Sequence, residues 1–191
     1  MSDAGKTLPG GGRVCPARHA GWLATSLRRL VQDPEMILRG MVSPGETVVD
    51  IGCGPGFFTL PMARMVGEKG CVVAVDLQEA MLEQMRMRAG RSGLLPRIRP
   101  LLCTAGSIGF NGPADFALAF YMVHEVPDVV LFMGETHGML KERGRLLLVE
   151  PKFHVRAATF RKTVEIVREA GFRILSEPKV RLSRAVLFER G

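Results

Sequence analysis

The pattern that decides the fold lies in Val48-Val49-Asp50-Ile51-Gly52-Cys53-Gly54-Pro55-Gly56-Phe57-Phe58-Thr59. An apolar run ends in an acid, glycines then alternate with other residues, and an apolar periodic segment follows. That order predicts a buried strand, a tight turn and a helix. The glycines let a ligand approach the main chain closely. The N–H groups at the helix start favour the carboxylate or phosphate of a nucleotide-like cofactor.

Two classes of cofactor compete for such a turn. The dinucleotide fingerprint is Gly-x-Gly-x-x-Gly, but the sixth position counted from Gly52 is Phe57. The pattern Asp50-x-Gly52-x-Gly54-x-Gly56 instead resembles the first motif of the class I S-adenosylmethionine (SAM) dependent methyltransferases. Within that family the chain is similar to the small-molecule type, which includes the ubiquinone/menaquinone methyltransferases. A turn that needs glycine only for packing is the alternative interpretation.

The composition indicates one globular domain. The chain has 191 residues, of which 47% are hydrophobic, a length that suits a single core. No apolar run approaches the roughly 20 residues that cross a bilayer, and we expect no secretory signal at the N-terminus. The four cysteines form no Cys-x-x-Cys pair, so neither a metal site nor a redox pair is indicated. We expect a cytoplasmic protein with buried, reduced thiols.

The charge balance leaves room for nucleic acid but does not favour it. The net charge is +7, which admits a nucleic-acid partner. The basic residues are scattered, however, and few aromatic residues lie among the densest group, which is Arg86, Arg88, Arg91, Arg97 and Arg99. A solvated surface is the favoured interpretation. We expect a monomer or homodimer with a small-molecule partner and no membrane partner.

The chain before the glycine turn divides into a tail and two helices. We expect residues 1–12, which are small and polar, to form a disordered tail, and residues 13–191 to form the single domain. Apolar residues from Trp22 to Val31 have helical spacing. Asp33-Pro34-Glu35 predicts the cap and first turn of a second helix, to about Met41. The resemblance implies that the helices of residues 13–43 lie over the active-site cleft.

An acid also ends the second predicted strand. The apolar run Cys71–Val75 predicts a parallel strand covered on both faces, and Asp76 follows it. A carboxylate there can accept hydrogen bonds from a ribose diol, although capping the helix over residues 78–88 is an alternative role. The segment resembles the second cofactor motif of the same family, in which Leu77 would lie against the adenine.

The resemblance implies the rest of the cofactor site. A third strand, Arg97–Leu102, is short and basic, which places it near an edge. Thr104 follows it and departs from the Asp-Ala pair that contacts adenine in many family members. The fourth strand, Asp115–Phe120, resembles the motif that passes the methionyl end of SAM. The expected cofactor contacts are Asp50, Gly52, Cys53, Gly54, Gly56, Asp76, Leu77, Thr104, Ala105 and Phe120.

Two residues are candidates for catalysis. His124 follows the fourth strand, at the place of an L-H-H segment in small-molecule methyltransferases, and such a loop lies at the ligand crevice of an open sheet. A positioned histidine can accept a proton, or it can simply hydrogen-bond the loop. Glu150 ends the fifth strand, Leu146–Val149, and could face the substrate. For Glu150 and the nearby His154, a strand-end cap or a solvated loop is the alternative.

The remaining pattern completes the fold. We expect a helix from Asp128 to about Lys141, a turn over residues 140–145, and an amphipathic helix over residues 157–170 that Gly171 ends. Phe172–Leu175 and Ala185–Phe188 have no helix between them and therefore pair as an antiparallel hairpin. The expected fold class is α/β: a Rossmann-like, three-layer α/β/α sandwich with a seven-stranded, mostly parallel sheet, order 3-2-1-4-5-7-6, strand 7 antiparallel.

The resemblance implies a SAM-dependent methyltransferase that transfers a methyl group, by in-line SN2 transfer, to an unidentified small-molecule acceptor. S-adenosylhomocysteine would be the other product. The sulfonium already makes the methyl carbon electrophilic, so the protein has mainly to place the acceptor, and proximity and orientation supply roughly 7–11 kcal/mol. An RNA methyltransferase and an NAD(P)-dependent oxidoreductase are the alternatives that stay open.

Overall fold

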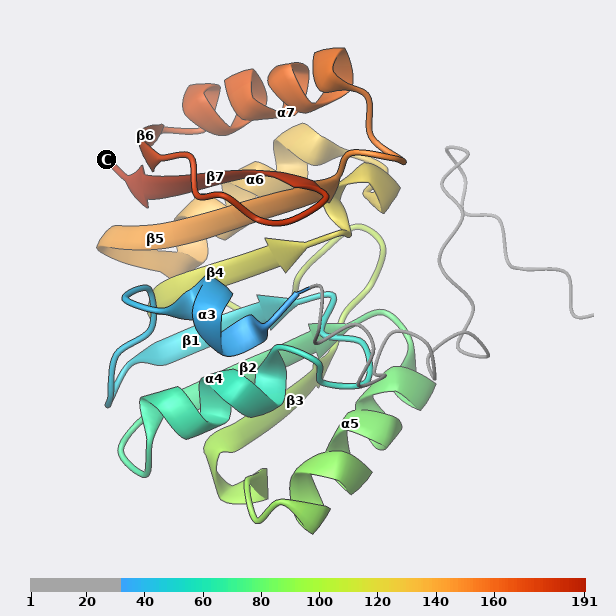
Figure 1. Ribbon diagram of the computed structural model, residues 1–191, viewed down its shortest axis with the longest axis vertical. Helices are drawn as coiled ribbons and strands as arrows, with labels where there is room; N and C mark the ends of the chain where they lie inside the picture. The colour runs from blue at the N-terminus through green and yellow to red at the C-terminus, as the bar shows by residue number, and fades with distance from the viewer. Residues whose placement is uncertain (1–31) are drawn as a thin grey trace, which may run out of the picture.

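The computed structural model describes residues 32–191. The predicted tail at residues 1–12, the helix over Trp22–Val31 and Cys15 lie outside the described residues. The described chain forms one seven-stranded sheet with helices on both faces (Figure 1). The strand order is β3-β2-β1-β4-β5-β7-β6, which confirms the predicted topology. β3 lies at one edge of this sheet, as predicted, and β6 lies at the other.

Five neighbouring strands run parallel, and the last strand runs against them. β1 to β5 pair in parallel, whereas β7 pairs antiparallel with both β5 and β6. The strands are β1 (Thr47–Ile51), β2 (Cys71–Asp76), β3 (Ile98–Leu102), β4 (Ala114–Phe120), β5 (Leu140–Pro151), β6 (Phe172–Ser176) and β7 (Ser183–Arg190). The carboxyl ends of β1, β2 and β4 therefore meet at one rim of the sheet.

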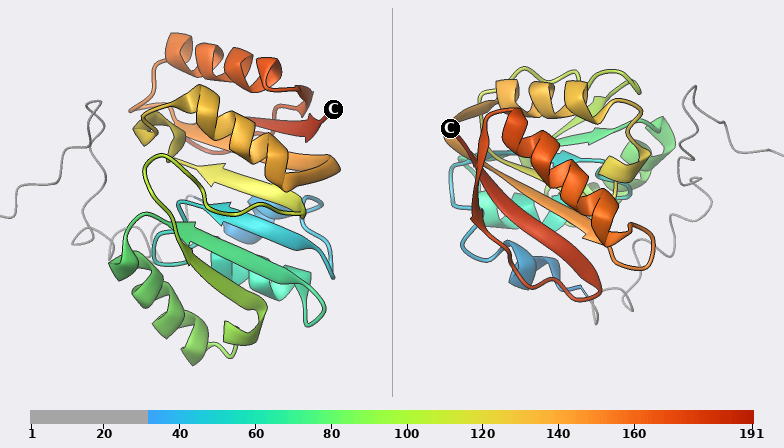
Figure 2. Two further views of the ribbon diagram at one scale, coloured as in Figure 1. Left: turned by 180° about the vertical axis from the view of Figure 1, so that it is seen from behind. Right: turned by 90° about the horizontal axis from the view of Figure 1, so that it is seen from above.

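The helices on the two faces of the sheet come from different parts of the chain. One core cluster joins the sheet to the first three helices and the other joins it to the last two (Figure 2). Adjacent β1 residues illustrate the division, because Val48 belongs to the first cluster and Val49 to the second. The helices are α3 (Pro34–Leu38), α4 (Thr59–Val66), α5 (Glu79–Arg91), α6 (Val129–Met139) and α7 (Ala157–Glu169), with short 3-10 turns η2 (Leu95–Arg97) and η3 (Val123–Glu125).

Two elements differ from the sequence prediction. α3 ends at Leu38, earlier than the predicted Met41, because Arg39 leaves the helical conformation and Gly40 takes a φ of +74°. β5 begins at Leu140, where a turn was expected, and its pairing with β4 shifts between Ala114 and Phe116. The predicted turn residues are thus a bulge inside a long strand.

A side-chain contact holds that bulge in place. The ammonium of Lys141 donates to Oδ1 of Asp115 at 2.6 Å, and Oδ2 of the same carboxylate accepts from the Thr47 amide at 2.9 Å. One acid on β4 therefore ties the start of β1 to the bulge of β5. Arg143 takes a φ of +61° within this irregular segment, so the local turn signal and the strand pairing coexist there.

Candidate functional site

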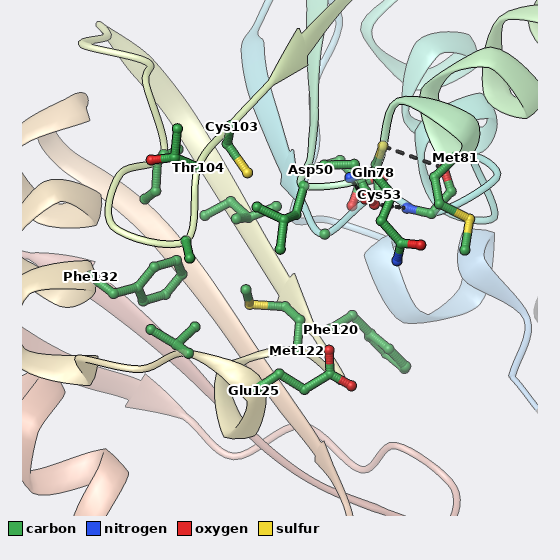
Figure 3. A pocket seen from close by; sticks show the side chains of 18 of the residues that line it. Asp50, Cys53, Gln78, Met81, Cys103, Thr104, Phe120, Met122, Glu125 and Phe132 are labelled. Carbon is green, nitrogen blue, oxygen red and sulfur yellow. Dashed lines mark hydrogen bonds between the residues drawn. The ribbon is translucent and has the colours of Figure 1, made fainter. Parts of the chain in front are cut away.

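A cavity of about 280 Å³ lies over the carboxyl ends of β1, β2 and β4. Its walls come from the loops after β1, β2 and β3 and from the segment that joins β4 to α6 (Figure 3). Open α/β sheets bind ligands at this rim. The predicted cofactor residues that line it are Asp50, Gly52, Cys53, Gly54, Asp76, Leu77, Thr104, Ala105 and Phe120, whereas Gly56 does not line it.

The glycines of the turn have different tasks. Gly56 has a φ of +84°, and a Cβ atom there would lie 2.7 Å from Leu60 Cδ1 and 2.8 Å from Met85 Cγ. Gly56 therefore lets α4 and α5 approach the turn, which is the packing role that the sequence left open. Gly54 has a φ of +52°, lines the cavity, and has no atom within 4 Å of the place of a Cβ. The space beside Gly54 is open to a ligand.

Asp76 joins the two predicted cofactor motifs. Its Oδ2 accepts from the Gly54 amide at 2.8 Å and its Oδ1 from the Gln78 amide at 2.9 Å. Burial raises the pKa of this carboxyl, and the amides of Gln78, Gly54 and Leu77 partly offset the rise. A carboxylate has about four lone-pair sites, so Asp76 keeps acceptor capacity toward the cavity beyond its bonds to the Gly54 and Gln78 amides. The capping role that the sequence left open is not observed, because no side chain within residues 32–191 caps α5.

Asp50 lies beneath the turn. Its carboxylate is almost fully buried, and the Thr59 hydroxyl in the first turn of α4 donates to it at 2.5 Å. The amides of Gly52 and Cys53 both donate to the Val75 carbonyl at 2.9 Å. These bonds fix the end of β1 against β2. The sequence prediction did not include Thr59, because nothing in the motif marked its hydroxyl as the partner of Asp50.

The part of the cavity lining that residues 32–191 form is acidic. It contains five carboxylates and, within those residues, no Lys, Arg or His. Two of the acids also hold the framework: Asp128 accepts from the Leu131 amide at the start of α6, and Glu135 accepts from the Ile108 amide at 2.6 Å. The five acids are Asp50, Asp76, Glu125, Asp128 and Glu135. Such a lining attracts a ligand with net positive charge.

The two predicted catalytic residues form a pair behind the cavity and do not line it. The Nδ1 atom of His124 lies 2.7 Å from Oε2 of Glu150, and the His124 amide donates to Oε1 at 3.0 Å. The ring of His154 packs edge-on against His124, with centroids 4.7 Å apart. Burial lowers the pKa of His124, but the hydrogen bond and charge of Glu150, with the charge of Glu125, raise it above its ordinary value.

Tyr121 is a cavity residue that the sequence prediction missed. It follows β4 with a φ of +62°, which few side chains adopt. Its hydroxyl lies 2.5 Å from the Ser183 hydroxyl and accepts from the Gln32 side chain at 2.5 Å. Strained residues of this kind gather at functional sites. Because its partners are 62 and 89 residues away, no local pattern could have identified it.

The two cavity cysteines are uncharged thiols near neutral pH. Burial, followed by the charges of Asp50 and Asp76, raises the pKa of Cys53. Burial and the charge of Asp76 raise the pKa of Cys103 to about 11. Within residues 32–191, no three His, Cys, Asp or Glu side chains are arranged to hold a metal ion. In the same residues, no helix combines the length and apolar character needed to cross a bilayer.

Comparison with known proteins adds a family to this geometry. Residues 48–144 match the family described as "Methyltransferase domain". The chain is 35% identical over 134 residues to aklanonic acid methyltransferase DauC of Streptomyces sp. (strain C5), which covers 70% of this chain and 57% of that protein. It is 31% identical over 108 residues to the ubiquinone/menaquinone biosynthesis C-methyltransferase UbiE of Vibrio vulnificus, covering 56% of this chain and 42% of that protein.

The chain spans 57%, 31% and 42% of the first three curated relatives that it matches. Among solved structures, a SAM dependent methyltransferase from Aquifex aeolicus superimposes with a TM-score of 0.83 at 24% identity, over 92% of this chain and 98% of that one. The [4+2]-cyclase SpnF superimposes with a TM-score of 0.70 at 17% identity, over 82% and 80%. These structures share the fold, and the cyclase shows that the fold by itself does not select a reaction.

Proposed function

This chain belongs to the SAM-dependent methyltransferase family, and on that premise we propose that it transfers the methyl group of SAM to a small-molecule acceptor. The observation that carries the proposal is the contact between Asp76 and the Gly54 amide at the rim of an acidic cavity. SAM suits that cavity because its sulfonium and ammonium outnumber its one carboxylate. A dinucleotide would bring an anionic pyrophosphate, and Phe57 stands where its motif needs glycine.

Each group of cofactor residues would contact a different part of SAM. Asp76 would hold the ribose hydroxyls with the acceptor capacity that its two amide bonds leave. Leu77, Thr104 and Ala105 would contact the adenine. The amino-acid end would lie at the turn around Gly54, where the main chain is open. This assignment is supported by the common cavity of these residues.

Bound SAM supplies an electrophilic methyl group on a sulfonium. The chain has to bind and orient the acceptor beside it and to exclude water. An aromatic wall serves that purpose: the ring of Phe58 lies 5.2 Å from Phe57 and 4.4 Å from Phe120, and Phe120 lies 4.4 Å from Tyr121, as measured between centroids. The His124–Glu150 pair does not line the cavity, so any general-base assistance from it would have to act through a residue that does.

The names of the relatives support a small-molecule acceptor. They refer to aklanonic acid, to ubiquinone and menaquinone biosynthesis, and, for a protein of Nostoc sp. that is 28% identical over 134 residues, to 2-phytyl-1,4-naphtoquinone. We assign the same broad class to this chain. The comparisons give no support to an RNA methyltransferase or an NAD(P)-dependent oxidoreductase. The cytoplasmic location and the monomeric or homodimeric state that the sequence suggests belong to the same proposal.

A comparison of ligands tests the cofactor. We expect SAM and S-adenosylhomocysteine to raise the melting temperature, because a ligand at 100 times its Kd stabilises the native state by about 2.7 kcal/mol. NAD and NADP at the same concentrations should leave it unchanged. Isothermal titration calorimetry would give the Kd values independently. Stabilisation by NAD without stabilisation by SAM would contradict the proposal.

A further inference from the structure

The part of the cavity that residues 120–126 line, which we call the acceptor end, combines apolar walls with a carboxylate. The segment after β4 lines the cavity with Met122, Val126, Leu131 and Phe132, and Glu125 lies among them. In Figure 3 the side chain of Glu125 extends from this segment toward Phe120. An apolar pocket with few polar groups binds a largely apolar ligand, and the polar groups fix its orientation.

Glu125 also lies next to the His124–Glu150 pair behind the cavity. Its Oε1 lies 4.0 Å from Nε2 of His124, whose other ring nitrogen lies 2.7 Å from Glu150. The Glu150 side chain is 3% exposed, that of His124 is 17% exposed and that of Glu125 is 27% exposed. The three groups thus lead from the buried end of β5 to the cavity, and the member that reaches the cavity is the one that the sequence prediction did not name.

We propose that Glu125 contacts the methyl acceptor, and that the acceptor is a neutral, largely apolar molecule that presents an O–H or N–H group to it. This inference rests on the proposed function. During transfer, a lone pair of the acceptor oxygen or nitrogen forms the bond to the methyl carbon. The bond from carbon to sulfur breaks and its electron pair stays on sulfur. The acceptor proton passes to the Glu125 carboxylate, which returns it to solvent.

His124 and Glu150 have a supporting part in this arrangement. Glu150 fixes His124 through the Nδ1 atom of the ring and through the backbone amide. The ring, when protonated, lowers the proton affinity of the Glu125 carboxylate, whose Oε1 lies 4.0 Å from Nε2. The charged or titratable groups that face His124 are Glu150, Glu125 and His154. His124 is therefore a positioning residue. An anionic acceptor would meet the carboxylates of the cavity lining, and like charges repel.

Three related probes test the acceptor class without knowledge of the natural acceptor. With the protein saturated by S-adenosylhomocysteine, calorimetry measures the Kd of 1-naphthol, of its methyl ether 1-methoxynaphthalene, and of 1-naphthoate. We expect 1-naphthol to bind at least fivefold more tightly than the ether, which lacks the O–H group. 1-Naphthoate should bind most weakly because of its charge.

Variants assign that preference to particular residues. Glu125→Gln should reduce the preference for 1-naphthol over the ether to within twofold, and Glu125→Asp should keep part of it. Glu177→Gln, an exposed change far along the chain, is the control and should behave as wild type. Between pH 6 and 8 the preference should rise as His124 loses its proton and Glu125 becomes the stronger acceptor. In His124→Gln it should not change with pH.

The outcomes separate this inference from the proposed function. Failure of the wild type to bind SAM or S-adenosylhomocysteine would remove the proposed function. Three results, each with normal cofactor binding, would overturn this inference alone. They are equal affinity for 1-naphthol and its ether, no binding of any of the three probes, and an unchanged preference for 1-naphthol in Glu125→Gln. A flat pH profile in the wild type would remove the role of His124.

Discussion

The two ends of the cavity are held by different kinds of interaction. At the cofactor end, residues 50–54 and 76–78, the contacts involve the main chain: Gly54 donates to Asp76, and Gly52 donates to the Val75 carbonyl. At the acceptor end, residues 120–126, side chains of distant segments meet, as Tyr121 does with Ser183. The cofactor end is thus fixed by main-chain contacts of short segments. Side chains at the acceptor end can therefore be replaced with little effect on the cofactor end.

The largest effect should follow from removing Asp76. Two hydrogen bonds from the ribose to a charged acceptor are each worth about 1.5–3 kcal/mol, so Asp76→Ala should weaken SAM binding by roughly 10²-fold or more. Calorimetry measures the Kd for SAM. Asp76→Asn keeps a carbonyl acceptor, so its Kd should lie between those of the wild type and Asp76→Ala. Circular dichroism shows whether the variant stays folded. Unchanged SAM affinity in a folded Asp76→Ala would show that the cofactor end is misassigned.

The pH dependence of SAM affinity should follow the same carboxyl. The ribose binds the ionised form, so affinity falls as pH drops through the pKa of Asp76. Because burial raises that pKa, the decline should begin at a higher pH than an ordinary aspartate would give. Calorimetry from pH 7 downward measures it, with Asp76→Asn as the control that lacks this titration. A decline confined to the ordinary aspartate range would contradict the burial of Asp76 in solution.

A pair of glycine variants should separate packing from binding. Gly56→Ala has two costs, a positive φ worth about 1–2 kcal/mol and overpacking against Leu60 and Met85 worth about 1–3 kcal/mol, so urea unfolding should show a loss of about 2–5 kcal/mol. Gly54→Ala has only the first cost to stability. Its methyl group instead occupies the open space beside the turn, and SAM affinity should fall. Equal stability of the two variants would contradict the assigned roles.

The acceptor end should tolerate change better. Tyr121→Phe removes the hydroxyl that Ser183 and Gln32 share, and we expect the free energy of unfolding to fall by about 1–3 kcal/mol, as measured by urea titration. SAM affinity should stay within twofold. Leu182→Ala, at an exposed neighbour of Ser183, is the control for disturbance of the loop. A loss of SAM binding as large as that of Asp76→Ala would show that the two ends are not separable.

The smallest effect on stability at neutral pH should come from Glu150→Gln, because the amide oxygen can still accept from the His124 amide and the NH2 group can donate to Nδ1 of the other neutral tautomer. The pKa of His124 is raised in the folded wild type. The histidine therefore contributes stability that is fully present below its unfolded pKa and is lost as pH rises through its folded pKa. Glu150→Gln should lower the pKa of His124 and flatten this loss. NMR titration of the ring and unfolding between pH 6 and 9 measure both. An unchanged histidine titration would disprove the coupling.

The fold could be predicted from the sequence because its signals are local. The apolar runs ending in Asp50 and Asp76 marked β1 and β2, and the two strands without an intervening helix marked the β6–β7 hairpin. The early start of β5 could not be predicted, because it depends on the pairing of Leu140 with Ala114, which lies on another strand, far away in sequence. Propensity near residues 140–145 indicated a turn, and the tertiary contact made it part of a strand.

The site divides in the same way. The resemblance supplied the residues of the cofactor end, since their spacing along the chain is what the motif records. It supplied His124, and the end of the fifth predicted strand supplied Glu150 as a separate candidate. The structure shows that the two are hydrogen-bonded to each other behind the cavity. Tyr121 was missed as a cavity residue, since its hydrogen-bond partners lie 62 and 89 residues away. Glu125 was missed although it directly follows His124, since no pattern showed which side chain of that loop reaches the cavity. Side chains that meet only in the folded state carry no spacing by which a single sequence could identify them.

The two edge strands have a consequence for polymerisation. β3 carries Pro100 at its centre, and a proline offers no N–H to a strand from another molecule. β6 has two half-exposed apolar side chains, Ile174 and Leu175, but its register breaks between Ile174 and Ser176, and a bulged edge twists away from a flat partner. Sheet extension by a second copy is thus hindered at both margins.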